Sequence, residues 1–393
     1  MVLSISLSVT ITSPVLALNI GEAVQVAADR LQLEQKPQGN WLLEEDYIGS
    51  IVAGMVSAYQ VICDSGHKSS AELGGDYIIN FGRAYEDQVY ALTRLSEIAD
   101  DPLDNSWRTA VSNFYYNVKY GPCGTEGYIS GRLDPLEPST AVFYLANAVV
   151  AAYYVDAEDK HIFRNSLIRF LADVDDSTSW YPVLGLGIAT WALAQTGDMN
   201  GTLVDLNGTG RPYWNSVTLA DLPDLLLGHQ VPDGNLYEGS FYWRFDHTNG
   251  NNPDEQAAGY TEDTIFGVLG LAAACKTNPE LNCGSAFPSA RDVLLVGVHE
   301  DGTVYEHIWL DGYIYYFYAG EMLQALGELM IPGDLNLDGC VDFSDFARFA
   351  RNWCAYGCTR CSWCDGADIN HSGEVNNYDL EMVAQYWLQG INQ

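Results

Sequence analysis

The strongest hydrophobic pattern in the chain is a set of stretches that are apolar or small at nearly every position. Four of them read I-V-A-G-M-V-S-A-Y, A-V-F-Y-L-A-N-A-V-V-A-A-Y-Y, P-V-L-G-L-G-I-A-T-W-A-L-A and I-F-G-V-L-G-L-A-A-A. A helix that is apolar on all sides is buried on all sides. We therefore predict buried helices at residues 48–61, 140–154, 183–194, 264–274 and 315–329.

Amphipathic stretches alternate with these buried helices. Residues 20–35, 85–98 and 160–171 place apolar side chains at helical spacing on one face. Amphipathic and buried helices that pair repeatedly along a chain can form two concentric rings. The sequence therefore predicts an all-α fold, an α/α toroid spanning residues 19–330, with β structure limited to hairpin-like runs at 236–245 and 303–309. An ordinary helical bundle is the alternative.

A short motif follows the first predicted helix. Gln35, Gly39 and Trp41 form the pattern Q-x-x-x-G-x-W, and residues 225–234 loosely repeat its helix end, glutamine and glycine turn. The motif resembles the repeat of the squalene-cyclase and prenyltransferase toroids. The resemblance covers residues 20–330 and implies the toroid fold.

A duplicated acidic loop lies near the C-terminus. D-L-N-L-D-G-C-V-D-F-S-D begins at Asp334, and D-I-N-H-S-G-E-V-N-N-Y-D begins at Asp368. Each loop has oxygen-bearing residues at calcium-ligand positions and a glycine at position 6, where the loop turns sharply. Position 7 needs only a main-chain carbonyl oxygen, which any residue supplies. The predicted calcium ligands are Asp334, Asn336, Asp338, Cys340, Asp342 and Asp345 in the first loop, and Asp368, Asn370, Ser372, Glu374 and Asp379 in the second.

Each of these loops ends in aspartate and is followed by one predicted helix, at 343–353 and at 377–388. The duplicated loop-helix pattern resembles the type I dockerin module over residues 333–390. The resemblance implies two bound calcium ions and a docking face on the two helices for a cohesin-like or cell-surface partner. We place the module at residues 331–393, beginning at the turn Ile331-Pro332-Gly333.

The charge and the first residues favour an exported protein. The formal net charge is −34, with 52 acidic and 18 basic residues, which argues against nucleic-acid binding because that needs basic patches. Residues 1–18 are mostly apolar and small and end near V-L-A, which predicts a signal peptide; a buried strand is the alternative. No other stretch is long and apolar enough for a membrane span. We expect a secreted or cell-surface protein.

Nine cysteines are present, and four of them cluster in the sequence: Cys354, Cys358, Cys361 and Cys364. In a cytosolic protein this spacing would indicate a zinc or iron–sulfur site. In an exported chain it favours disulfides that staple a small module. Cys275 and Cys283 could close a second small loop.

The longest predicted loop, 230–263, contains the stretch E-G-S-F-Y-W-R-F-D-H at 238–247, which has the densest mixture of aromatic and ionisable residues in the chain. A glycosidase needs one protonated and one ionised carboxyl group, whereas a lyase needs a base and a cation that neutralises the uronate. The candidate catalytic residues are Arg244, Asp246, His247, Glu262 and Asp263, and the candidate sugar-stacking residues are Tyr242, Trp243 and Phe245. A structural ion pair in the loop and a helix cap at 261–263 are the alternative explanation.

Dockerin-like modules usually accompany polysaccharide-degrading domains, so we expect a glycoside hydrolase or polysaccharide lyase with a polysaccharide substrate. Two other functions stay open. The first is a non-catalytic glycan-binding or surface scaffold protein. The second follows from Asp173-Val174-Asp175-Asp176, which resembles the acid motif of class II terpene cyclases. An acidic helix start explains the same residues without any such activity.

Overall fold

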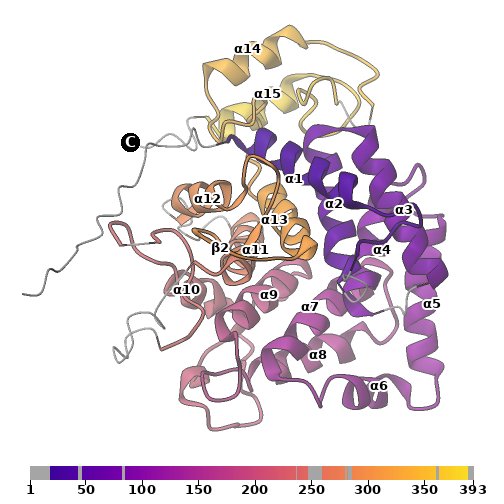
Figure 1. Cartoon of the computed structure of the whole chain (residues 1–393), viewed down its shortest axis with the longest axis vertical. Coiled ribbons are helices and arrows are strands. Elements are labelled where there is room, and N and C mark those ends of the chain that lie inside the picture. The colour runs from indigo at the N-terminus through magenta and orange to yellow at the C-terminus, as the bar shows by residue number, and fades with distance from the viewer. Residues whose placement is uncertain are drawn as a thin grey trace, which may run out of the picture.

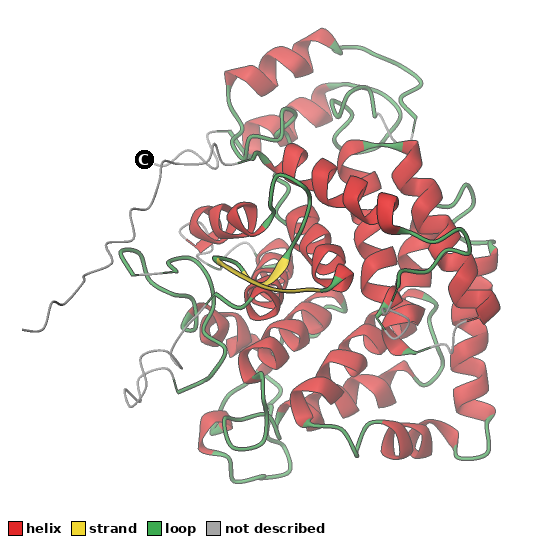
Figure 2. Ribbon diagram, viewed as in Figure 1, coloured by secondary structure: helices red, strands yellow, loops and turns green. Residues whose placement is uncertain are grey.

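The computed structural model describes residues 18–42, 47–81, 85–235, 237–246, 259–278, 281, 286–359 and 363–387. This part of the chain is mainly helical and contains one short two-stranded sheet (Figure 2). The all-α class is therefore confirmed. The predicted signal peptide lies outside the described residues except for Leu18. None of the helices in the ranges above is long and apolar enough to cross a membrane.

Six helices pack side by side in a closed cycle, in which each contacts the next and the last contacts the first (Figure 1). We call them the ring helices: α2 (Ile48–Ile62), α4 (Glu86–Ile98), α7 (Pro138–Tyr154), α9 (Pro182–Gln195), α11 (Thr261–Thr277) and α13 (Tyr316–Glu328). Five of them coincide with the predicted buried helices. The sixth, α4, has the polar start of an amphipathic helix, yet Glu86, Asp87 and Gln88 are also buried.

Six further helices cover the ring from outside, and each contacts two neighbouring ring helices. They are α1 (Ile20–Glu34), α3 (Ser65–Phe81), α5 (Ser106–Tyr120), α8 (Lys160–Leu171), α10 (Leu222–Leu227) and α12 (Ala286–Gly297). The connections add α6 (Gly124–Arg132), two short 3-10 turns and the antiparallel strands β1 (Tyr305–His307) and β2 (Leu310–Ile314). The sequence pattern did not reveal α3 or α5.

The ring helices run in the same direction. The Ser50 hydroxyl on α2 donates to the Glu321 carboxylate on α13 at 3.0 Å, and further along the two helices Ser57 lies against Gly327. Corresponding contacts align α2 with α4, α7 with α9, α9 with α11 and α11 with α13. The N-terminal ends of the ring helices therefore gather at one end of the ring, and their C-terminal ends gather at the other.

Glycines let neighbouring ring helices approach backbone to backbone. A Cβ atom on Gly54 of α2 would lie 2.1 Å from the carbonyl oxygen of Gly320 on α13, and one on Gly187 of α9 would lie 2.5 Å from that of Phe266 on α11. No side chain can occupy such a position without moving a helix. The short distance between neighbouring ring helices therefore depends on these glycines.

Two glutamines cross-link consecutive outer helices. Gln35 Nε2, after α1, donates to the main-chain oxygens of Gly39 at 3.0 Å and of Ser70 in α3 at 2.9 Å. Gln230 Nε2, after α10, donates to the main-chain oxygen of Gly239 at 3.1 Å and to that of Ala286 in α12 at 3.0 Å. The repeat noted in the sequence therefore has the same bonding at both places.

The predicted hairpin at 236–245 is wrong for the residues that the structure describes there. Residues 237–246 form turns, and their ladder pairing is a single bridge between Gln230 and Phe241. Phe241 instead inserts its ring against α11, where Gly267 leaves room for it. Main-chain hydrogen bonds from Val231, Gly239 and Tyr242 flank this bridge, but the pairing does not extend into strands over the described residues. The run at 303–309 contains β1, as predicted.

The C-terminal residues form a second, smaller hydrophobic cluster, with α14 (Phe343–Arg351) and α15 (Asn377–Gln385). It lies beside α1 and α12, at the end of the ring where the ring helices finish (Figure 1). Arg291 Nη1 on α12 donates to the main-chain oxygen of Gly339 at 2.9 Å, and Leu337 packs against Gly21 of α1. The first acidic loop is thus in direct contact with the helical domain.

We predict that Gly54→Ala lowers the free energy of unfolding by about 1–3 kcal/mol or more, because its methyl group must push α2 away from α13. Gly131→Ala is the matched control, because a Cβ atom there meets nothing within 4 Å and Ala favours helix. Denaturant unfolding of the three proteins measures the effect. Equal stability of Gly54→Ala and the wild type would show that the ring contact is not tight.

Candidate functional site

Five of the six ring helices have a tyrosine at the N-cap position. We call these five the tyrosine collar: Tyr47, Tyr85, Tyr181, Tyr260 and Tyr315. None of the five side chains makes an N-cap hydrogen bond. Ser, Thr, Asp and Asn are the residues that stabilise this position, and tyrosine is not among them. Helix capping therefore does not explain why tyrosine recurs there.

The collar is partly open to solvent. Tyr47 and Tyr315 are each 40% exposed, and the neighbouring Trp180 and Tyr313 are 72% and 70% exposed. Tyr47 and Tyr315 both stack on Phe317, with ring centroids 4.6 and 5.4 Å away. A surface with aromatic faces and hydroxyl groups side by side suits a ligand that is apolar on one face and polar at its edges.

Asp87, in the first turn of α4, is a buried carboxyl group next to this collar. Burial, with a further contribution from neighbouring Glu86, raises the pKa of Asp87 to about 7. Neither carboxyl oxygen has a hydrogen-bond partner of normal geometry within the described protein, although main-chain N–H groups of Gln88 and Gly49 offset part of the shift. Gly49 of α2 lies directly against this carboxyl group. Asp87 is therefore protonated over most of the acidic range.

Two further buried carboxyl groups, Glu262 and Asp263, lie in the first turn of α11. Burial, together with the charge of Glu306 on β1, raises the pKa of Glu262 to about 7. Asp263 is 1% exposed, and burial and then Glu262 raise its pKa well above the usual value. Glu262 as a whole residue is half-buried. The predicted candidates Glu262 and Asp263 thus sit at the collar, opposite α4 in the order of the ring.

Two residues of α6 hold Glu86 at the start of α4. The Tyr128 hydroxyl donates to Glu86 Oε1 at 2.8 Å, and Arg132 Nη2 lies 3.5 Å from Oε2. The Arg132 guanidinium also lies over the ring of Tyr85, 4.7 Å from its centroid, and over that of Tyr144, at 5.1 Å. Glu86 is fully buried, so this pairing keeps its charge compensated.

The other predicted site residues lie on the turn that follows Phe241. Phe245 stacks on Tyr213 with ring centroids 3.7 Å apart, so one face of its ring is already covered. The Arg244 guanidinium lies over the Trp243 ring and 3.7 Å from the Asp176 carboxylate. His247 lies outside the described residues. The structure brings Tyr242, Trp243, Arg244 and Asp246 together on this turn.

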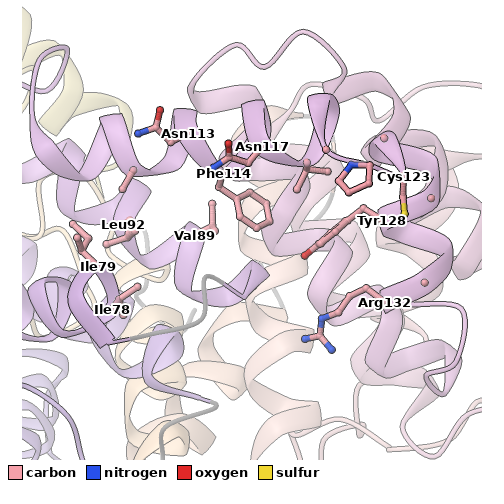
Figure 3. Close-up of a pocket in the computed structure, with 17 residues that line it drawn as sticks. Ile78, Ile79, Val89, Leu92, Asn113, Phe114, Asn117, Cys123, Tyr128 and Arg132 are labelled. Atoms are coloured by element: carbon pink, nitrogen blue, oxygen red, sulfur yellow. The ribbon is translucent and has the colours of Figure 1, made fainter.

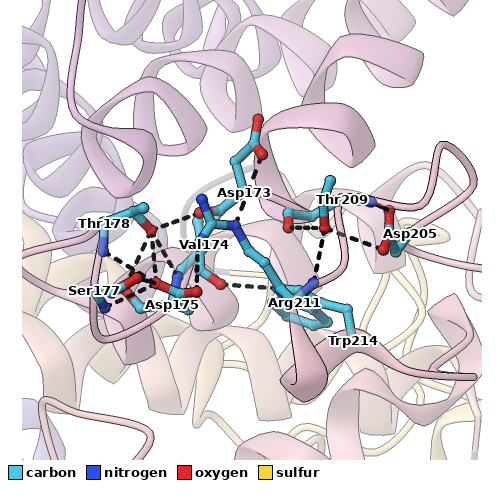
Figure 4. A network of polar contacts seen from close by, with 10 residues as sticks. Asp173, Val174, Asp175, Ser177, Thr178, Asp205, Thr209, Arg211 and Trp214 are labelled. Atoms are coloured by element: carbon cyan, nitrogen blue, oxygen red, sulfur yellow. Dashed lines mark hydrogen bonds and ion pairs between the residues drawn. The ribbon is translucent and has the colours of Figure 1, made fainter.

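The acidic motif at 173–176 anchors loops rather than standing free (Figure 4). Arg211 pairs with Asp175 and lies 3.8 Å from Asp173. Burial opposes the shift, but hydrogen bonds from Ser177 and Arg211 lower the pKa of Asp175 to about 2. Asp176 accepts hydrogen bonds from the main-chain N–H groups of the 241–246 turn, at 2.9 and 2.7 Å. An acid that protonates an alkene needs the opposite pKa shift, which disfavours the cyclase alternative.

The first acidic loop has its carboxylates turned inward. Asp334 accepts hydrogen bonds from the main-chain N–H groups of Asp338 and Gly339, at 3.2 and 2.8 Å. Asp345 accepts from those of Leu335 and Asn336, at 2.7 and 3.0 Å. Burial, followed by the nearby carboxylates, raises the pKa of Asp334 to about 7. A cation among these oxygens would remove the repulsion that favours protonation.

The second acidic loop repeats this bonding. Asp368 accepts from the main-chain N–H groups of Ser372 and Gly373, and Asp379 accepts from that of Asn370. No three His, Cys, Asp or Glu side chains in the described ranges converge enough to hold a metal by themselves. Amide, hydroxyl and main-chain oxygens would therefore have to complete each loop, and oxygen donors of these kinds suit calcium.

Disulfide chemistry is confirmed in the cysteine-rich segment between the loops. Cys358 and Cys364 form a disulfide bond, and Cys275 is disulfide-bonded as well. The proposed partner of Cys275, Cys283, lies outside the described residues, as does Cys361. In the described part of this segment, the cysteines therefore support disulfide bonds rather than a metal site.

Sequence reasoning missed Asp87, Glu86, Glu306 and the collar itself. A signal was present, because a tyrosine directly precedes α2, α4, α9, α11 and α13 in the sequence. A residue type shared by five helix starts becomes informative only when the helix boundaries are known. The order of the helices around the ring places α4 opposite α11, and this order is not visible in the sequence.

We predict that Asp87→Asn stabilises the protein in a pH-dependent way. Between pH of about 4 and 7 the unfolded chain ionises Asp87 while the folded chain keeps its proton, so stability falls as pH rises through this window. The variant lacks this loss, so its Tm should equal that of the wild type near pH 4 and exceed it by a few degrees near pH 8. Calorimetry at both pH values tests this, with exposed Asp134→Asn as control. The same Tm difference at both pH values would contradict the burial of a protonated Asp87.

Comparison with known proteins characterises the C-terminal part of the chain. No curated protein matches the chain. Residues 332–388 match the family model of the dockerin type I domain. Dockerin type I domains bind calcium and cohesin partners. The match covers both acidic loops, α14 and α15, so this part of the chain is similar to a calcium-binding docking module.

Proposed function

We propose that the helical domain is a glycoside hydrolase of the α/α-toroid type and that the C-terminal module docks it to a cohesin-like partner. The observation that carries the proposal is the tyrosine collar around two carboxyl groups, Asp87 and Glu262, whose pKa values burial raises to about 7. Strongly shifted carboxyl groups in an open aromatic site are typical of acid–base catalysis.

In this mechanism Asp87 is the general acid and Glu262 the general base. Asp87 is almost fully buried, and burial makes it hold its proton. To act as the acid it has to be brought into contact with the glycosidic oxygen when the substrate binds, and it then donates that proton as the bond to the leaving sugar breaks. Glu262 is the more exposed of the two, and its ionised form takes a proton from the attacking water. Because both pKa values lie near 7, activity should be highest near neutral pH and fall on either side.

Hydrolysis of a neutral glycan agrees better with the charges than elimination from a uronate. Acidic residues gather in two groups at this end of the ring: Glu86 and Asp87 on α4, and Glu262, Asp263, Glu306 and Glu321 on α11, β1 and α13. Among the described residues, the cation that pairs with these acidic residues is Arg132, and it is already used by Glu86. A lyase would have to place an anionic sugar ring beside these carboxyl groups without a compensating charge, which is unfavourable.

The turn at 241–246 is a proposed rim of the same site. Asp176, just before ring helix α9, fixes this turn, so Trp243 and Arg244 stay close to the collar end of the ring. We retain Arg244, Asp246 and His247 as proposed contributors to substrate binding or proton transfer, and Tyr242, Trp243 and Phe245 as proposed stacking residues. A non-catalytic glycan-binding protein is the second candidate, favoured by the exposed aromatic residues of the collar.

Docking and catalysis would use opposite ends of the molecule. The module rests where the ring helices finish, and the collar lies where they begin. A partner bound to α14 or α15 would therefore leave the collar open to a polysaccharide. Together with the predicted signal peptide, this arrangement suits a secreted or cell-surface component of a cellulosome-type assembly.

The activity prediction uses the purified full chain and a panel of neutral polysaccharides, with detection of new reducing ends. Asp87→Asn and Glu262→Gln should each lower turnover by roughly a hundredfold or more, because proton transfer in the transition state is lost. Asp134→Asn, which alters an exposed ion pair with Arg169, should leave turnover unchanged. Full activity of Asp87→Asn would remove it as the acid. Binding without cleavage by the wild type would favour the glycan-binding alternative.

We also propose that the module binds two calcium ions, one in each acidic loop. Calorimetric titration of the full chain should give two equivalents, and Asp334→Ala and Asp368→Ala should each remove one. Glu381→Gln, which changes an exposed carboxylate of α15 outside the loops, should keep both. Absence of calcium uptake at millimolar concentration would overturn the calcium proposal.

A further inference from the structure

A groove lies among the outer helices that cover α4, and Figure 3 shows the residues that line it. It lies between α3, α4, α5 and α6 and encloses about 720 Å³. Ile79 and Leu92 form one side, Asn113, Phe114 and Asn117 of α5 form another, and Tyr128 and Arg132 of α6 close it. A volume of this size lies within the range of small-molecule binding sites.

The groove differs in charge from the rest of the protein. The chain has 52 acidic residues, yet among the described residues that line this groove there is no aspartate or glutamate, and Arg132 is the one charged side chain. Arg132 is paired with Glu86, so its charge is compensated. A groove without net charge in a chain of net charge −34 selects a neutral ligand over an ionic one.

The walls combine apolar surface with unused amide groups. Asn113 and Asn117 are four residues apart on α5, so their side chains lie on one face of the helix. Both are exposed, and neither makes a side-chain hydrogen bond within the described protein. Between them lies Phe114, whose ring packs edge-on against Tyr128 at 5.9 Å between centroids. Amide donors and acceptors beside an aromatic ring match the hydroxyl edge and the apolar face of a sugar.

Two residues link the groove to the start of α4, where the proposed catalytic acid lies. Tyr128 and Arg132 line the groove and also bind Glu86, the residue before Asp87. Arg132 lies over Tyr85 of the collar, so groove and collar share one wall. A glycan chain that lies in the groove therefore reaches the collar at Arg132, whose charge is compensated by Glu86.

We propose that this groove binds a neutral glycan chain and extends the substrate site beyond the collar. The proposal rests on the proposed glycosidase function. It names the substrate class of that site as a polymer or long oligosaccharide of uncharged sugars, held by Asn113 and Asn117 at several units from the bond that is cleaved. A disaccharide would occupy the collar alone.

The test is calorimetric binding of a neutral disaccharide and a neutral hexasaccharide of the same series to the full chain carrying Asp87→Asn. We use cello-, xylo- and manno-oligosaccharides as probes. The hexasaccharide should bind more tightly than the disaccharide. Adding Asn113→Ala with Asn117→Ala should weaken hexasaccharide binding by about tenfold, because two hydrogen bonds are lost, and should leave disaccharide binding unchanged.

Tyr116→Ala is the control, because Tyr116 lies on the same helix, is exposed and does not line the groove. Equal hexasaccharide affinity with and without the two asparagines would overturn the groove proposal, whether or not the wild type cleaves glycans. Binding of an apolar peptide or a detergent to the groove, in place of the sugar, would overturn it too. Hexasaccharide binding that depends on the asparagines, with no cleavage by the wild type, would support the groove and contradict the catalytic proposal.

Discussion

Backbone-to-backbone packing of parallel helices is the constraint on which the rest of this structure depends. Glycines at Gly54, Gly187 and Gly320 let ring helices approach so closely that no side chain fits between them. Such contacts close the ring and fix the order of its helices. Since the ring helices run in the same direction, the closure also brings their first turns to one end. Residues that are distant in sequence, such as Asp87 and Glu262, are gathered at that end by backbone packing alone.

The electrostatics of that end follow from this packing. Carboxyl groups in the first turn of a helix are usually favoured as anions by the helix dipole. Here burial dominates, and the pKa values of Asp87 and Glu262 rise to about 7. Keeping these carboxyl groups buried lowers the stability of the folded protein at neutral pH. Functional sites typically carry such a loss of stability. Tyrosines at the N-caps add to this, because they occupy positions where a smaller polar residue would stabilise the helix better.

The all-α class, the buried helices and both calcium-type loops could be predicted because each depends on local pattern. The fully apolar stretches marked five ring helices, and the spacing of oxygen-bearing residues marked the loops. The ring helix α4 and the acid Asp87 were missed because a polar first turn resembles an exposed one, and only the closed ring buries it. The stretch at 238–247 has the densest mixture of aromatic and ionisable residues, but Phe245 and Arg244 are partly used in holding the 241–246 turn on Tyr213 and Asp176. Whether such a side chain holds the fold or binds a ligand depends on its tertiary contacts, and the sequence does not show those contacts.

The central claim is that the tyrosine collar binds a sugar chain between Asp87 and Glu262. A crystal structure of Asp87→Asn soaked with a neutral oligosaccharide tests it most directly. The account predicts sugar rings stacked on collar tyrosines, with a glycosidic oxygen within hydrogen-bond distance of residue 87 and a water between the sugar and Glu262. A sugar bound elsewhere on the molecule, or an empty collar at saturating oligosaccharide, would contradict it.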